Sequence, residues 1–290
     1  MNLEAAPTFR PSGDPKLDDL RARLSAELGA VEGAADIRQR ATEVLAEYMA
    51  QGRAALAEHV RAHPLDTRFL LDGQTALTDR VVIAAVDVAI SWLTPNPNPT
   101  KSERITVLAV GGYGRAEMAP FSDVDLLFLT PYKQTPWGER VIEAVMYILW
   151  DLKLKVGQAV RTVDECLRLG QTDITIRTAL LEHRFLVGER DAAEDLQARL
   201  WSDLFAKTGP QFIEAKLEER AQRHKRQGGS RYLLEPNVKE GKGGLRDLQT
   251  LYWIAKYLHN VSQPADLVAK GVFTQEEFEI FERAEGLNPS

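Results

Sequence analysis

Residues 110–129 read VGGYGRAEMAPFSDVDLLFL and join a glycine-rich turn to a strand that begins with acids. Before the turn, residues 104–110 (RITVLAV) are β-branched and apolar. Residues 124–129 (VDLLFL) are similarly apolar, so each run predicts a buried strand. Side chains two apart on a strand point to the same face, so Asp123 and Asp125 project together. Two neighbouring carboxylates repel each other unless a cation lies between them. Magnesium suits this role because it prefers a few carboxylate oxygens together with phosphate oxygens and water.

The turn upstream of the acids has the features of a phosphate site. Gly111 and Gly112 end the first strand and let the backbone approach a ligand closely. We expect a short helix over residues 114–118 there, with free N–H groups that bind an anion. Ser122 directly precedes the acids and can donate a hydrogen bond to a phosphate oxygen, while Arg115 adds a positive charge. The turn and the acids together predict a site for magnesium and a triphosphate.

Each half of this pattern is usually structural when it occurs alone. An Asp-x-Asp at the start of a strand is most often a turn or a solvent-facing feature, and so is a lone diglycine turn. Their combination across one strand–turn–strand unit favours a functional site. A dinucleotide-binding turn is excluded because Gly112-x-Gly114 is followed by Glu117 where the third glycine is required. The segment before the next strand is also too short for a βαβ crossover.

The rest of the chain surrounds this unit with predicted helices. A helix over 137–152 leads to a third strand over 155–162 (KVGQAVRT), and Asp66 caps a long earlier helix with a candidate break near Gly73. Later helices are expected at 172–186, 191–207, 210–227, 244–259 and 274–285. The domains are expected to be a disordered segment 1–13, a helical segment 14–95, a sheet domain 96–190 and a helical domain 191–290. The fold class is therefore α+β, with a small mixed sheet flanked by helical regions.

The composition is that of an ordinary globular protein, with 44% hydrophobic and 27% charged residues among 290. The net charge of −6 argues against a general basic surface for nucleic acid. One cysteine, Cys166, excludes an internal disulfide framework and fits a reducing cytosol. No segment has the pattern of a secretory signal, and no apolar run approaches the ~20 residues that span a bilayer. We therefore expect a cytoplasmic protein that contacts neither nucleic acid nor membrane.

A second glycine-rich segment precedes the helix predicted at 244–259. Lys242, Gly243, Gly244 and Arg246 form a second candidate contact for phosphate or nucleotide, because a helix N-terminus attracts anions. The alternative is a glycine-rich connector with solvated lysines. If the segment is functional, we expect a nucleotide cleft between it and the strand that bears the two acids.

Three stretches of the sequence together resemble one family. They are residues 110–129, residues 150–162 (WDLKLKVGQAVRT) and residues 233–255 (LLEPNVKEGKGGLRDLQTLYWIA). In order and spacing they are similar to the N-terminal part of the bacterial PII uridylyltransferase/uridylyl-removing enzymes, within the DNA polymerase beta-type nucleotidyltransferase superfamily. The resemblance implies transfer of UMP from UTP to a tyrosine of the nitrogen-regulatory protein PII, with release of pyrophosphate. It also implies that Gly111 and Gly112 bind phosphate, and that Asp123 and Asp125 bind the magnesium ions of an in-line displacement.

The sequence departs from the family's pattern in two ways. The superfamily often has a third carboxylate on a later strand, whereas residues 155–162 contain none and Gly157 lies near the expected position. Asp173 and Asp247 are candidates to replace it, although either is equally suited to capping a helix. The full family enzymes also carry a hydrolase domain marked by a His-Asp pair and two glutamine-sensing domains. None of the five histidines here precedes an aspartate, so we expect a piece of a longer protein without uridylyl removal or glutamine sensing.

Two other functions fit the same residues. The turn and the acids do not encode base selectivity, so adenylyl transfer, or nucleotide transfer to a small acceptor, is the first alternative. The second alternative is a non-catalytic nucleotide-binding or regulatory module, which the missing third carboxylate favours.

Overall fold

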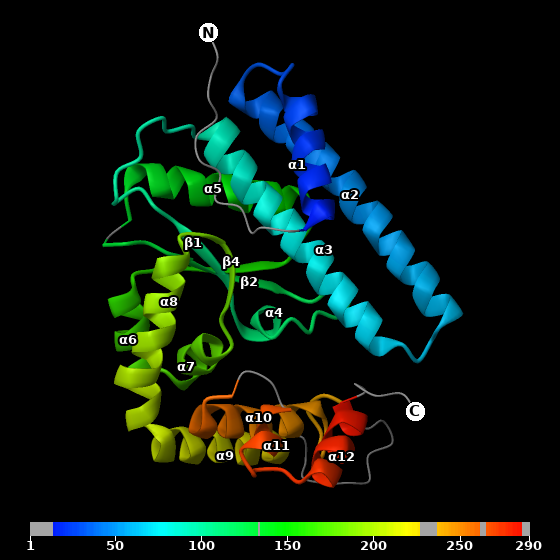
Figure 1. Ribbon diagram of the computed structural model, residues 1–290, viewed down its shortest axis with the longest axis vertical. Coiled ribbons are helices and arrows are strands. Elements are labelled where there is room, and N and C mark those ends of the chain that lie inside the picture. Colours follow the sequence, from blue (N-terminus) through cyan, green and yellow to red (C-terminus); the bar gives the residue numbers. More distant parts are fainter. Residues whose placement is uncertain (1–13, 133, 227–236, 262–264, 286–290) are drawn as a thin grey trace. The chain divides into compact units, whose positions relative to one another are not determined.

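The computed structural model describes residues 14–132, 134–226, 237–261 and 265–285 (Figure 1). The chain divides into two compact units. The first contains Met1–Cys166 and Glu182–Leu196, and the second contains Leu167–Leu181 and Gln197–Ser290. The prediction of disorder for residues 1–13 lies outside the described residues. Within the described ranges, no helix combines the length and the apolar character needed to cross a membrane.

A four-stranded mixed sheet with strand order β3-β2-β1-β4 forms the centre of the first unit. Its strands are β1 (Thr106–Ala109), β2 (Val124–Leu129), β3 (Val156–Arg161) and β4 (Arg184–Gly188). Strand β1 runs antiparallel to both β2 and β4, whereas β2 and β3 are parallel. The mixed sheet and its flanking helices confirm the predicted α+β class.

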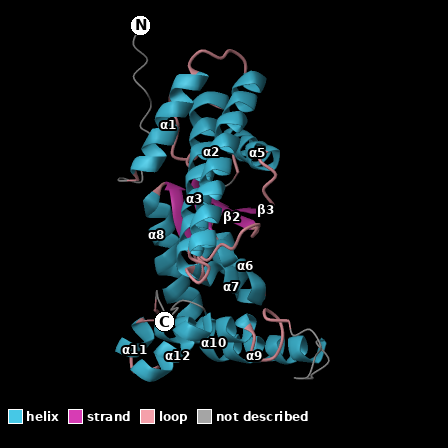
Figure 2. Cartoon of the chain, turned by 90° about the vertical axis from the view of Figure 1, so that its right-hand side faces the viewer, coloured by secondary structure: helices cyan, strands magenta, loops and turns pink. Residues whose placement is uncertain are grey.

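Helices of the first unit pack together and against the sheet (Figures 1 and 2). They are α1 (Pro15–Leu28), α2 (Ala34–Ala62), α3 (Thr67–Val88, followed by a π-helical turn over Ala89–Leu93), the short α4 (Gly111–Gly114) and α5 (Pro136–Asp151). The Asp66 carboxylate accepts a hydrogen bond from the Phe69 N–H and caps α3, as predicted. One core joins the apolar faces of these helices to the side chains of β1 and β2, so the strands that bear the site are held rigidly.

The second unit is helical. Helix α6 (Val163–Thr172) and helix α8 (Arg190–Arg199) each contribute residues to both units. The remaining elements are α7 (Ile174–Leu181), a π-helical turn over Leu200–Leu204, a 3₁₀ turn over Phe205–Lys207, α9 (Gly209–Arg226), α10 (Leu245–His259), α11 (Asp266–Ala269) and α12 (Gln275–Glu285). Aromatic packing joins α9 to α10, because the rings of Phe212 and Tyr257 stack at 3.9 Å. The Lys216 ammonium lies 4.7 Å from the ring centre of Trp253.

Three local predictions were wrong. The helix expected at 172–186 is α7, which ends at Leu181, and residues 184–188 instead form β4. This short apolar run is a strand because β1 supplies its hydrogen-bonding partner, which a local pattern does not reveal. The short helix expected at 114–118 lies earlier, over Gly111–Gly114. Helix α3 continues through Gly73, since one glycine costs a helix only about 1 kcal/mol and the buried positions of α3 outweigh that cost.

Candidate functional site

The two acids lie at the start of β2, where a buried strand reaches the surface. Asp123 is exposed and directly precedes the strand, and Asp125 is partly buried as its second residue. Val124 and Leu126 are each 1% exposed, so the core fixes the backbone that carries the carboxylates. Burial raises the pKa of the Asp125 carboxyl, and the negative charge of Asp123 raises it further. The acids therefore lie within electrostatic reach of each other, as the period of the strand predicted.

The diglycine turn lies beside these acids. The Val110 N–H donates to the Asp125 carbonyl at 3.0 Å, which joins the end of β1 to the start of β2. Gly111 has a φ of 58°, a value that few side chains tolerate, and a Cβ at this residue would lie 3.4 Å from the Asp125 Oδ2 atom. The first N–H groups of a helix have no partner within it, so α4 presents backbone donors at this turn. The structure thus brings together the turn and the acids that the sequence singled out.

Gly157 faces Asp125 across the parallel pair of β2 and β3. A Cβ at Gly157 would stand 2.4 Å from the Asp125 Oδ1 atom, so even a methyl group would displace this carboxylate. The superfamily's third carboxylate was expected near Gly157. This glycine has no side chain, which leaves room for the Asp125 carboxylate.

Arg115 is bound to other side chains of the first unit. Its Nη1 donates to both carboxylate oxygens of Glu182 at 2.9 and 2.8 Å, and its Nε donates to Glu117 at 2.9 Å. Its side chain is only 11% exposed. The predicted contact between Arg115 and a triphosphate stays a prediction, because two carboxylates already neutralise this guanidinium. Ser122 is partly buried, its N–H donates to the Ala119 carbonyl, and its predicted phosphate contact also stays a prediction.

Helix α3 fastens the turn from another side, through residues that the sequence did not single out. The Thr75 hydroxyl donates to the Ala116 carbonyl at 2.9 Å and accepts from the Met118 N–H at 3.2 Å. Arg184 on β4 donates to the Tyr113 carbonyl and forms a two-pronged ion pair with Asp79. The sequence carries no local signal for these contacts, because Thr75 and Asp79 lie in a largely polar stretch of α3, residues 74–80 (QTALTDR).

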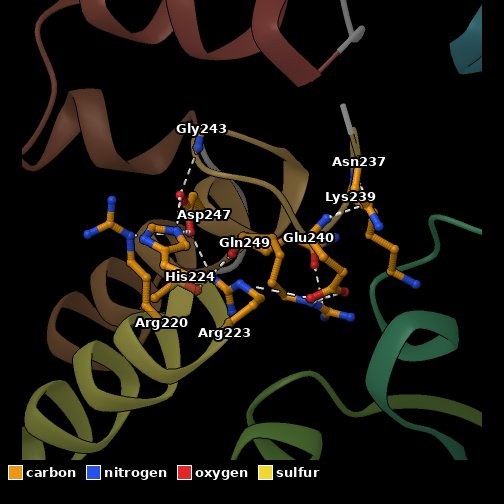
Figure 3. A network of polar contacts seen from close by, with 11 residues as sticks. Arg220, Arg223, His224, Asn237, Lys239, Glu240, Gly243, Asp247 and Gln249 are labelled. Carbon is orange, nitrogen blue, oxygen red and sulfur yellow. Dashed lines mark hydrogen bonds and ion pairs between the residues drawn. The ribbon is translucent and has the colours of Figure 1, made fainter. Parts of the chain in front are cut away.

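The second candidate contact, in the second unit, forms a closed network of polar groups (Figure 3). Asp247 in the first turn of α10 accepts from the Gly243 N–H at 2.9 Å, from Arg223 at 2.6 Å and from His224. Burial opposes ionisation of the Asp247 carboxyl, but these donors outweigh it and lower its pKa to about 2. The network ties the segment before α10 to the end of α9. These contacts support a loop held by specific hydrogen bonds rather than a loosely held connector.

Arg246, a cationic residue of the same segment, is also bound to other side chains. Arg246 lies 3.5 Å from a carboxylate oxygen of Glu240 and donates to Gln249 at 3.1 Å. Lys242 and Gly243 are exposed, and Gly244 precedes α10 as its N-cap. The structure brings the four predicted residues together at one helix terminus, and a phosphate contact there stays a prediction.

Comparison with known proteins shows which families the chain resembles. A family model described as Glutamate-ammonia ligase adenylyltransferase matches residues 8–162, and one described as GlnD PII-uridylyltransferase matches residues 211–287. A bifunctional uridylyltransferase/uridylyl-removing enzyme from Cereibacter sphaeroides is 64% identical over 248 residues, which is 86% of this chain and 27% of the relative. A protein of the same name from Ruegeria pomeroyi is 55% identical over 264 residues, covering 91% of this chain and 29% of the relative.

The chain belongs to the family of bifunctional uridylyltransferase/uridylyl-removing enzymes. It spans somewhat more than a quarter of the length of the curated relatives that it matches. The two family models differ in the nucleotide that their descriptions imply, since the N-terminal match carries an adenylyltransferase description and the C-terminal match a uridylyltransferase one. The relatives that match most of the chain carry the uridylyltransferase name.

Both candidates for the superfamily's third carboxylate are held by local hydrogen bonds, and Asp173 caps a helix. The Asp173 carboxylate accepts from the Thr175 and Ile176 N–H groups at 2.7 and 3.0 Å, at the start of α7. The Asp247 carboxylate is held in the network of Figure 3. In the part of the chain that the structure describes, no group of three or more His, Cys, Asp or Glu side chains is arranged to hold a metal. The metal-binding role of Asp123 and Asp125 stays a prediction.

Proposed function

We propose that the chain transfers UMP from UTP to a tyrosine of the nitrogen-regulatory protein PII and releases pyrophosphate. The observation that carries this proposal is the position of the diglycine turn, which lies against one of two neighbouring carboxylates. A second support is the name shared by relatives that match 86–91% of the chain.

The residues present fit magnesium. Burial raises the pKa of the Asp125 carboxyl and the negative charge of Asp123 raises it further, as expected for like charges that a cation would relieve. Asp123 and Asp125 would hold the ions, while the triphosphate and water supply the remaining oxygen ligands. Bound magnesium would neutralise charge on the triphosphate and on the leaving pyrophosphate.

The chain's own residues have mainly a positioning role in this reaction. The tyrosine oxygen forms a bond to the α-phosphorus while the bond to the pyrophosphate oxygen breaks, and the tyrosine proton passes to a base or to water. Gly111, Gly112 and Ser122 would bind phosphate oxygens through backbone and hydroxyl donors. Lys242, Gly243, Gly244 and Arg246, in the second unit, are a separate candidate contact for phosphate or nucleotide. Such a reaction depends on alignment and charge stabilisation more than on covalent chemistry by the protein.

One experiment tests the reaction directly. The chain is incubated with magnesium, PII and UTP labelled at the α-phosphate, alongside the Asp123→Ala variant. Labelled PII should appear with the unaltered chain and fall to background with the variant. Labelling that never exceeds this control supports the non-catalytic binding module instead.

Adenylyl transfer is the second candidate, because the family model that matches residues 8–162 carries an adenylyltransferase description. UTP and ATP are compared in thermal melts with magnesium. Stabilisation by UTP supports uridylyl transfer, whereas stabilisation by ATP alone contradicts it.

A further inference from the structure

Glu182 is a buried carboxylate with no part in the chemistry described so far. It lies in the connection between α7 and β4, belongs to the first unit and is 2% exposed. A charged group at this depth is stable only if it is paired and hydrogen-bonded. Its partner is Arg115, one residue beyond the end of α4.

In the Arg115–Glu182 pair one guanidinium nitrogen donates to both carboxylate oxygens, and the pair is largely excluded from solvent. Burial opposes the charge of Arg115, but the carboxylates of Glu182 and Glu117 outweigh it and raise the pKa of the guanidinium. Removal of one charge would leave the other buried and unpaired, which is costly. The pair therefore fixes where the backbone of Arg115 lies.

The backbone of Glu182 fixes α4 as well. A Cβ at Gly114 would stand 1.9 Å from the Glu182 carbonyl oxygen, so the two backbones are in direct contact. The Arg115 N–H donates to the Gly111 carbonyl at 3.2 Å, which passes this constraint to the residue beside the Asp125 carboxylate. A continuous path of contacts thus leads from Glu182 to the diglycine turn.

We propose that Glu182 is a positioning residue of the nucleotidyltransferase site, which acts through Arg115 and holds the diglycine turn against Asp125. The proposal rests on the proposed function, since it assigns the turn to nucleotide phosphates. Glu182 itself contacts no substrate. Arg115 then has a positioning role through its ion pair, which differs from the direct phosphate contact that its sequence position first indicated.

A matched control separates positioning from stability. Asp87 on α3 forms a comparable ion pair, with its Oδ2 atom 2.7 Å from the Nε of Arg21 on α1. This pair joins two helices of the same unit and does not touch the turn. The Asp87→Asn variant therefore loses a half-buried ion pair without a change at the site.

The test compares Glu182→Gln, Arg115→Gln, the double variant and Asp87→Asn. Magnesium–UTP affinity is measured by calorimetry and PII labelling by steady-state kinetics, both well below the melting temperature of each variant. Glu182→Gln should lower kcat/KM by ~10- to 100-fold, as expected for a small misplacement of substrate. The double variant should lose no more than the larger single loss, because the two residues act as one unit. Asp87→Asn should keep kcat/KM and UTP affinity, because the ion pair that it removes does not touch the turn.

Three results would overturn the proposal. The first is a kcat/KM and a UTP affinity of Glu182→Gln that match those of Asp87→Asn. The second is a multiplication of the two single losses in the double variant, which would show that Glu182 and Arg115 act independently. The third is the absence of magnesium–UTP binding by the unaltered chain, which would also contradict the proposed function. If the unaltered chain binds UTP but labels no PII, the uridylyl-transfer proposal alone fails, and the ratio of UTP affinities decides whether Glu182 positions the turn.

Discussion

Gly112 and Gly114 lie in the same short helix, and the structure predicts opposite consequences when each is changed to alanine. A Cβ at Gly112 would have the Arg115 Nη2 atom, at 3.8 Å, as its nearest neighbour, and the φ of Gly112 is not positive. The fold therefore tolerates Gly112→Ala, which can stabilise it by about 0.4–1 kcal/mol through the unfolded chain. If a phosphate approaches the backbone here, the same methyl group obstructs it. Gly112→Ala should thus keep stability and lose nucleotide affinity.

The expected size of the effect follows from ligand linkage. UTP at about 100 times its Kd stabilises the folded chain by about 2.7 kcal/mol, which raises Tm by ~5–11 °C for a chain of this size. A tenfold rise in Kd reduces this stabilisation to about 1.4 kcal/mol, or ~3–6 °C. Thermal melts with and without magnesium–UTP measure both the intrinsic Tm and the shift caused by the nucleotide.

Gly114→Ala is the reciprocal control. Its methyl group would overlap the Glu182 carbonyl oxygen, so the backbone must move, at a cost of ~1–3 kcal/mol and a Tm loss of ~2–12 °C without ligand. If Gly112→Ala retains the full UTP-dependent shift and the full rate of PII labelling, phosphate does not approach this turn and our assignment of the diglycine is refuted.

Three further predictions follow from the site and the α9–α10 network. Asp125→Asn should lower PII labelling at least ~100-fold, because charge neutralisation by held metal is worth several kcal/mol. Its Tm should not fall, since burial and the Asp123 charge already raise the pKa of Asp125; a lower Tm would show that Asp125 is mainly structural. Gly157→Ala should also reduce PII labelling, because its Cβ would lie 2.4 Å from the Asp125 Oδ1 atom. Its Tm should change little, because Gly157 is exposed. Unaltered labelling would show that a methyl group at residue 157 does not displace the Asp125 carboxylate. Burial opposes ionisation of the Asp247 carboxyl, but the Gly243 N–H and the basic side chains of α9 outweigh it and lower its pKa to about 2. The ionised carboxylate therefore stabilises the fold above its ordinary pKa of 3.8. This contribution is lost as the pH falls from 3.8 towards 2, so Asp247→Asn should flatten the acid limb of a Tm–pH profile. An unchanged acid limb would sink this assignment.

The sequence determined the local parts of the site. Strands β1, β2 and β3 were predicted within two residues of their observed ends, because each is a short run bounded by a breaker, a turn or a helix. The common direction of Asp123 and Asp125 was predicted from the period of a strand, although β2 begins only at Val124. The cap at Asp66 and the alternative cap at Asp173 were also legible, since a capping carboxylate bonds N–H groups only a few residues away.

Only the tertiary structure determined which residues of other elements contact these groups. The start of strand β4 was predicted as the end of a helix over 172–186, because its five residues are a strand only beside β1. The partner of Arg115 is 67 residues away, and the contact between Gly157 and Asp125 depends on the parallel register of β2 and β3. Local patterns report the geometry of one element, whereas ion pairs and register are set when separate elements pack. The sequence therefore singled out candidate groups for the chemistry, and the fold decided which groups hold them in place.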